Sequence, residues 1–274
     1  MDYKYHCYIP AGRGRNELPF NPCHVLDFGL LVLGAGETWT GESGDREILA
    51  VILGGTATFT VGGEKFPAVG GRPHVFAGKP HSVYLPAGTT VTIEALSPVE
   101  IALPSAPSDL SVAPYVIEPS RVASGRWGAA NFGRNYHQIL TEIAQPDLPA
   151  RRLIVGETYT PSGNWSTYPP HRHGEDNLPV EAAHEEMYYF RVNPSDGFGI
   201  CRMYTDEGYE ENFTAREHGM QMMPAGYHTV VSAPGYTTYY LWVLAGTQRT
   251  QAALEDASLT WVGRTVPMLR DLGH

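Results

Sequence analysis

Short runs of β-forming residues, each closed by glycine or proline, recur along the whole chain. The apolar run Glu47–Leu53 has the length of a strand and ends at Gly54 and Gly55. Residues 56–61 then alternate before a second glycine pair at 62–63. The 274 residues include 30 glycines and 22 prolines, while stretches rich in Ala, Glu, Lys and Leu are rare. The regular recurrence of glycine and proline between these runs predicts an all-β fold in which turns join many short strands.

The strand-like segments fall into two halves of similar order. Those of the first half continue with residues 74–78, 82–88 and 90–95, and those of the second half are residues 153–159, 186–192, 199–205 and 239–244. A Pro-Ala-Gly turn occurs in each half, at Pro86 and at Pro224. We therefore expect a duplicated β-barrel. A Pro/Ser-rich run at residues 103–108 predicts a first barrel in residues 1–110, with a linker and second barrel in residues 111–274.

Helix is expected only near the C-terminus. Residues 250–256 and 266–272 are the two candidates, and both are short.

Charge and cysteine content exclude several classes of function. The formal net charge is −10 and basic residues form no cluster, which argues against nucleic-acid binding. No apolar run approaches the roughly 20 residues of a membrane span, and the opening residues lack a signal peptide's apolar core. Three scattered cysteines predict reduced thiols. We expect a cytoplasmic protein.

Two histidines separated by one residue form the sharpest local motif. Side chains two apart on a strand point to one face, so His171 and His173 could reach the same ion. Such a pair also occurs in solvated loops. Here, however, Glu186 opens the next strand and His228 follows the Pro-Ala-Gly turn. This order of HxH, Glu, turn and His is the metal-binding pattern of cupins.

The pattern predicts one divalent metal ion bound by His171, His173, Glu186 and His228. Zinc and manganese suit this ligand set best, and iron or nickel would also fit it.

The choice of glutamate stays open at this level. Glu185 and Glu186 each share a strand face with apolar residues, so alternation does not separate them. Tyr189 and Phe190 stand three and four positions after Glu186, which is the cupin spacing and favours that residue. Residues 174–184 form a longer connection than in a minimal cupin, and this loop could overhang the metal.

These motifs resemble one known enzyme family. Residues 164–173 (NWSTYPPHRH), 185–189 (EEMYY) and 198–206 (FGICRMYTD) are similar to the 5-deoxyglucuronate isomerases of inositol catabolism. Residues 125–139, with Arg126, Gly133 and Arg134, also look like that family's interdomain region. The resemblance implies a bicupin, two jelly-roll barrels in one chain, with a metal in the C-terminal barrel only.

The first half agrees with a metal-free barrel. No HxH precedes Glu47, and residues 41–45 (GESGD) stand where the first ligand pair would be expected. We expect Glu47 and His81 to have structural or interfacial roles.

The resemblance also implies a reaction. An aldose acid, 5-deoxy-D-glucuronate, becomes the ketose 5-dehydro-2-deoxy-D-gluconate by metal-assisted enediolate proton transfer. We expect Arg202 to pair with the substrate carboxylate and Tyr188 or Tyr204 to contact substrate oxygens. The base is not identified, and Glu175 and His184 are alternative proton carriers.

Three other functions remain compatible with the motifs. One is the related isomerase of pectin breakdown, which acts on 5-keto-4-deoxyuronate. Another is an iron dioxygenase, whose turnover would depend on O₂. The third is a cupin that binds sugar acids without catalysis. In each case the partner is a small molecule, and a homodimer or higher homo-oligomer is possible.

Overall fold

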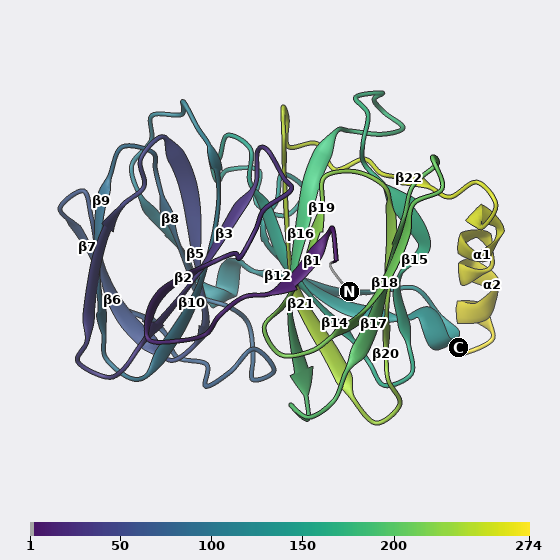
Figure 1. Cartoon of the computed structure of the whole chain (residues 1–274), viewed down its shortest axis with the longest axis horizontal. Coiled ribbons are helices and arrows are strands. Elements are labelled where there is room, and N and C mark those ends of the chain that lie inside the picture. Colours follow the sequence, from purple (N-terminus) through teal and green to yellow (C-terminus); the bar gives the residue numbers. More distant parts are fainter. Residues whose placement is uncertain (1–2) are drawn as a thin grey trace.

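The computed structural model describes residues 3–274 and contains two β-barrels, each built from two sheets (Figure 1). The first barrel combines a six-stranded sheet, in the order β11-β8-β5-β10-β3-β2, with a four-stranded sheet, in the order β4-β9-β6-β7. Their strands are β2 (Gly14–Glu17), β3 (Asp27–Leu33), β4 (Thr38–Glu42), β5 (Arg46–Gly54), β6 (Thr56–Val61), β7 (Glu64–Gly70), β8 (Ser82–Leu85), β9 (Thr90–Ala95), β10 (Val99–Pro107) and β11 (Tyr115–Ile117). All the pairings are antiparallel.

The second barrel has a seven-stranded sheet, β1-β19-β16-β21-β14-β13-β12, and a five-stranded sheet, β18-β17-β20-β15-β22. Their strands are β1 (His6–Tyr8), β12 (Ala123–Trp127), β13 (Arg134–Leu140), β14 (Ile154–Thr160), β15 (Trp165–Arg172), β16 (His184–Asn193), β17 (Gly199–Tyr204), β18 (Glu210–Ala215), β19 (Gly219–Met223), β20 (Tyr227–Ser232), β21 (Thr237–Gly246) and β22 (Leu254–Glu255). The expected all-β, two-barrel architecture is confirmed.

Apolar side chains fill the interior of the first barrel. Inward-facing side chains of its two sheets, among them Leu31, Ile52, Phe59 and Ile93, form one buried apolar cluster. Along a strand such as β9, buried side chains alternate with more exposed ones, because successive side chains point to opposite faces of the sheet. The buried set forms the core of the barrel. The core of the first barrel is therefore apolar.

The two barrels share a second apolar cluster. Phe28 of the six-stranded sheet stacks on Tyr189 of the seven-stranded sheet, with ring centroids 5.4 Å apart. A fully buried ion pair lies beside this layer, where Arg72 approaches Glu157 to 2.6 Å. The large sheets of the barrels therefore pack against each other and join the barrels into one body (Figure 1).

Glu47 connects the first barrel to the beginning of the second. Its carboxylate is completely buried and accepts backbone N–H bonds from Arg151, Arg152 and Leu153, at 2.7–2.8 Å. The Tyr84 hydroxyl donates a further bond of 2.6 Å. The interfacial role expected for Glu47 is confirmed. His81 also has structural contacts, since it accepts the N–H of Gly70 at 3.0 Å.

Two strands pair with the barrel on the other side of the boundary expected at residue 110. The N-terminal strand β1 pairs with β19 of the second barrel, and β11 pairs with β8 of the first. The Pro/Ser-rich run at residues 103–108 mostly belongs to β10, so it does not end the barrel. Residues 74–78, which look strand-like in the sequence, form turns.

Helices are few and lie at the C-terminal end. The helix expected at 266–272 is confirmed as α2 (Val266–Asp271). The one expected at 250–256 is wrong, because this segment is extended and pairs through β22 with β15. A helix that the sequence did not indicate, α1 (Thr260–Arg264), precedes α2. Short 3₁₀ turns occupy Pro119–Arg121 and Ala130–Phe132.

No helix in residues 3–274 has the length and apolar character of a membrane span. The cysteines Cys7, Cys23 and Cys201 are all free thiols, as expected.

Candidate metal centre

The four predicted ligands converge between the two sheets of the second barrel. His171 and His228 are directly paired residues of the neighbouring strands β15 and β20, so their side chains lie on the same face. His173 follows the end of β15, and Glu186 comes from β16 of the opposite sheet. One nitrogen or oxygen atom of each residue lies within 4.8 Å of those of the other three. The barrel therefore assembles a ligand set from both of its walls.

A carboxylate oxygen is at the centre of the group. Oε2 of Glu186 lies 2.8 Å from Nε2 of His173 and 3.0 Å from Nε2 of His228. The rings of His171 and His228 have their centroids 4.7 Å apart. His173, Glu186 and His228 are buried, and His171 is partly buried. Three imidazoles and one carboxylate in this arrangement match the donors that divalent transition metals prefer.

Two further observations fit a bound ion. The backbone carbonyl of His184 accepts a 2.8 Å hydrogen bond from Nδ1 of His173, which orients the ring and directs Nε2 at the cluster. Both ring nitrogens of His228 are buried and, within residues 3–274, neither forms a hydrogen bond of good geometry, although Nε2 lies 3.0 Å from the Glu186 carboxylate. A buried polar atom without a partner costs free energy, which a metal–ligand bond would offset.

Burial and mutual charge shift the pKa values of these groups in different directions. Burial, followed by the charges of His228 and His173, holds the pKa of His171 well below its usual value. Burial also lowers the pKa of His173, but the hydrogen bond and charge of Glu186 outweigh it and raise the pKa overall. The pKa of Glu186 falls below its usual range because the two histidines outweigh the effect of burial. Glu186 is thus ionised within the candidate ligand set.

The neighbouring glutamate has a different role. The carboxylate of Glu185 accepts the backbone N–H groups of His24, Val25 and Leu26, at 2.7–2.9 Å. These residues belong to the first barrel's segment before β3, so Glu185 points toward the contact between the barrels. The structure therefore places Glu186, and not Glu185, in the ligand set.

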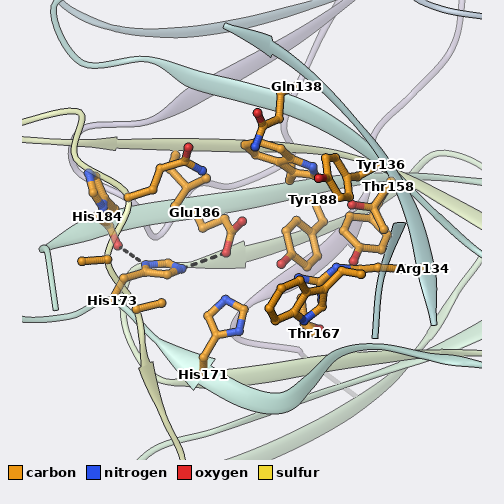
Figure 2. Close-up of a pocket in the computed structure, with 17 residues that line it drawn as sticks. Arg134, Tyr136, Gln138, Thr158, Thr167, His171, His173, His184, Glu186 and Tyr188 are labelled. Carbon is orange, nitrogen blue, oxygen red and sulfur yellow. Dashed lines mark hydrogen bonds and ion pairs between the residues drawn. The ribbon is translucent and has the colours of Figure 1, made fainter. Parts of the chain in front are cut away.

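The ligands open onto a cavity of about 310 Å³ inside the second barrel (Figure 2). Its wall is mixed: aromatic rings alternate with hydroxyl, amide and charged groups. Apart from the ligands His171, His173 and Glu186, its lining residues are Trp127, Arg134, Tyr136, Gln138, Thr158, Thr167, His184, Tyr188, Tyr240, Trp242, Leu244, Gln251, Ala252 and Ala253. A cavity of this size and polarity suits a small polar molecule.

Tyr188 is placed where the sequence suggests. Its buried ring lies 5.5 Å from the ring of His228, centroid to centroid, and lines the cavity. Burial and the charge of Glu186 raise the pKa of Tyr188 well above its usual value, so its hydroxyl stays protonated.

Arg202 and Tyr204 require a correction. They lie on the outer face of β17, because the residue directly paired with the inward-facing His228 is Met203. Arg202 forms an ion pair with Glu210 at 2.8 Å, and Tyr204 donates a hydrogen bond of 2.5 Å to Asp256. Neither residue lines the cavity. The sequence correctly indicates that they share a face, but that face is turned away from the metal centre.

The two alternative proton carriers are separated by the fold. His184 begins β16 and lines the cavity, whereas Glu175 is largely exposed and faces Arg172 at 3.7 Å. The loop that holds Glu175 is closed by the buried Glu181, which accepts the backbone N–H of Gly174 at 2.6 Å.

The sequence-based reasoning missed most of the cavity wall. Arg134, Tyr136 and Gln138 stand at alternate positions of β13, so they face the same way into the cavity. Their period-two spacing, within the segment that resembles the isomerase family, is the signal that could have identified them.

Comparisons with known proteins agree with this structure. The model of the KduI/IolB family matches residues 18–262. The 5-deoxy-glucuronate isomerase of Geobacillus kaustophilus is 40% identical over 239 residues, covering 86% of this chain and 85% of that protein. The enzyme of the same name from Bacillus subtilis (strain 168) is 37% identical, covering 86% and 87%.

Solved structures give the same fold. The crystal structure of an IolB-like protein from Salmonella typhimurium LT2 superposes with a TM-score of 0.88 at 29% identity, covering 95% of this chain and 100% of that chain. An oxalate decarboxylase from Lactobacillus farciminis superposes with a TM-score of 0.69 at 12% identity, covering 99% and 94%, and supports the bicupin fold alone. The expected isomerase class is confirmed by the named relatives. By family match and by identity over most of its length, the chain belongs to the KduI/IolB family.

Proposed function

We propose that the protein is a metal-dependent aldose–ketose isomerase that converts 5-deoxy-D-glucuronate to 5-dehydro-2-deoxy-D-gluconate. The observation that carries the proposal is the four-ligand cluster at the wall of a polar cavity. The names of the relatives support the choice of substrate. This function would place the protein in inositol catabolism, in the cytoplasm.

His171, His173, Glu186 and His228 would hold one divalent ion, with zinc or manganese as the proposed metals. When bound, the ion supplies a Lewis acid for the oxygens of the reacting carbons. The remaining chemistry is proton transfer, because the aldose and the ketose differ only in the positions of hydrogen atoms. A proton must leave C2 and arrive at C1, while the hydroxyl proton passes from the oxygen of C2 to that of C1.

His184 is our proposed proton carrier between C2 and C1. Apart from the candidate metal ligands, it is the only imidazole or carboxylate among the described residues that line the cavity. Its Nε2–H donates to the carbonyl of Gln248 at 2.9 Å, while the buried Nδ1 has no hydrogen-bond partner within residues 3–274. Burial lowers the pKa of His184, so the ring is neutral and able to accept a proton at pH 7.

Tyr188 would orient the substrate. Its hydroxyl is protonated at all physiological pH values, because burial raises the pKa of the phenol. It can therefore donate a hydrogen bond to a substrate oxygen but cannot act as the base. Its position beside His228 directs this bond to the metal end of the cavity.

The proposal is tested by following 5-deoxyglucuronate by NMR in D₂O with the metal-loaded protein, in one sample without oxygen and in one sample with it. We expect the aldehyde signal to disappear and the ketose to form without O₂. A requirement for O₂ would identify a dioxygenase instead. Binding of the sugar acid with no conversion under either condition would contradict the isomerase and indicate a binding protein. Supplying 5-keto-4-deoxyuronate in parallel distinguishes the pectin-derived substrate.

A further inference from the structure

One arginine in the cavity has no acidic partner. Arg134 belongs to the wall that contains the metal ligands, yet the ion pairs formed within residues 3–274 include none for its guanidinium. Two other arginines with little-exposed side chains pair with carboxylates, Arg72 with Glu157 and Arg191 with Glu100, while the buried Arg249 donates to backbone carbonyls. With 29 acidic against 19 basic residues, acidic partners are plentiful. A free guanidinium in such a chain suggests that its partner is a ligand.

The position of Arg134 relative to the metal ligands is defined by the barrel. It begins β13, opposite Trp127 of β12, and extends into the cavity from the side away from His173 and His184 (Figure 2). Arg134 lines this cavity together with His171, Glu186 and Tyr188.

The cavity wall around Arg134 carries polar groups that could bind the hydroxyls of a sugar. Tyr136 and Gln138 project from the same face of β13, and Thr158 lies on the adjacent strand. Gln251 also lines the cavity, and its Oε1 is buried with no hydrogen-bond partner within residues 3–274. Hydroxyl and amide groups of this kind match the hydroxyls of a sugar chain.

We propose that Arg134 binds the carboxylate of the substrate and so determines which end of the sugar reaches the metal ligands. The inference rests on the proposed isomerase function and names the group that positions its substrate. A uronic acid has its aldehyde at one end and its carboxylate at the other. If the carboxylate binds Arg134, the aldehyde and the adjacent carbon lie at His171, Glu186 and His228. Arg134 is then also the residue that selects acids over neutral sugars.

The shape of the guanidinium supports this orientation. The planar guanidinium offers two parallel N–H donors that fit a carboxylate. The buried ring of Tyr240 also lines the cavity, and its low polarity strengthens the pairing.

The test compares Arg134→Gln with Arg202→Gln as the matched control. Arg202 is the other arginine that the sequence suggests, and the structure places it outside the cavity. Calorimetry with the metal-loaded proteins measures binding of gluconate and of sorbitol, which differ only by a carboxylate in place of a hydroxymethyl group. Kinetics with 5-deoxyglucuronate give KM and kcat separately, and metal analysis verifies one ion per chain.

We expect Arg134→Gln to weaken gluconate binding about 10- to 100-fold and to change sorbitol binding less than about threefold. The KM for 5-deoxyglucuronate should rise by a similar factor, with Arg134→Lys recovering part of the loss. Arg202→Gln should behave as wild type. Equal gluconate affinity in Arg134→Gln and wild type, with metal retained, would overturn the proposal.

The two proposals fail in distinguishable ways. If the wild-type protein does not isomerise 5-deoxyglucuronate, the proposed function fails. The preference for gluconate over sorbitol, and its loss in Arg134→Gln, would still show that Arg134 binds a carboxylate. If isomerisation occurs but that preference is absent or is unaffected by the substitution, Arg134 is not the anchor.

Discussion

Glu185 and Glu186 are consecutive residues of β16 whose carboxylates serve opposite faces of one sheet. Glu186 lies among the histidines of the metal centre, while Glu185 holds the backbone of residues 24–26 in the first barrel. The alternation of side chains along a strand produces this division directly. One dipeptide therefore links the metal centre to the contact between the barrels.

Substitution of the two glutamates should separate metal binding from stability. Glu186→Gln removes the only anionic ligand, and we expect loss of the ion from the purified protein. Glu185→Gln should retain one ion per chain but lower the free energy of unfolding by about 1–3 kcal/mol, because three backbone N–H groups lose a charged acceptor. Metal analysis and denaturant unfolding of both variants provide the measurement. Metal loss in Glu185→Gln with retention in Glu186→Gln would reverse the assignment.

Substitution of His184 should reduce turnover and leave the ion in place. His184→Gln removes the proposed proton carrier, and we expect kcat to fall about 10²- to 10⁴-fold. The backbone carbonyl that orients His173 is retained, so the metal content should not change. Glu175→Gln is the matched control, because that side chain is exposed and lies outside the cavity wall. A kcat within twofold of wild type in His184→Gln would exclude it as the base.

Removal of the buried charge of Glu47 should destabilise the protein without affecting the metal. In Glu47→Gln, an NH₂ group replaces one carboxylate oxygen and cannot accept the backbone N–H groups of residues 151–153 that this oxygen binds. We expect a loss of about 2–4 kcal/mol in the free energy of unfolding. Denaturant titration measures this loss, and metal analysis is the control. Unchanged stability would show that the contact does not join the barrels.

Metal affinity should depend on pH through His173. In the metal-free protein its pKa lies above the usual 6.5, because Glu186 outweighs the opposing effect of burial. Binding of an ion must displace that proton, whereas His171, with a lowered pKa, is already neutral. The metal-free state thus binds more protons, and affinity should fall as the pH drops below the His173 pKa. Calorimetry at pH 6 in buffers of different ionisation enthalpy should show release of about one proton per ion. Heats that do not depend on the buffer would contradict this.

The convergence of the four candidate ligands could be predicted from the sequence because it depends on local order. His171 and His173 share a strand face by spacing alone, and the Pro-Ala-Gly turn brings His228 back to them. The strands and the two barrels were predictable for the same reason, since glycine and proline mark where each strand ends.

The cavity wall could not be predicted in this way. Alternation shows that Arg202 and Tyr204 share a face but does not say whether that face is inside the barrel. Residues 250–256 look helical in isolation. In the fold, Ala252 accepts the backbone N–H of Ala182 and Leu254 pairs with Arg172, so tertiary contacts outweigh the local preference. Arg134 belongs to the segment that resembles the isomerase family, but the sequence does not show that the fold brings it into the same cavity as His171 and Glu186.

Titration of metal into the chelator-treated protein tests the central claim most directly. Isomerase activity on 5-deoxyglucuronate is measured after each addition of zinc or manganese, together with the ions bound per chain. If His171, His173, Glu186 and His228 form the single catalytic centre, activity is lost on chelation and rises linearly to a plateau at about one ion per chain. Full activity in the chelated protein, or a plateau near two ions, would contradict the account.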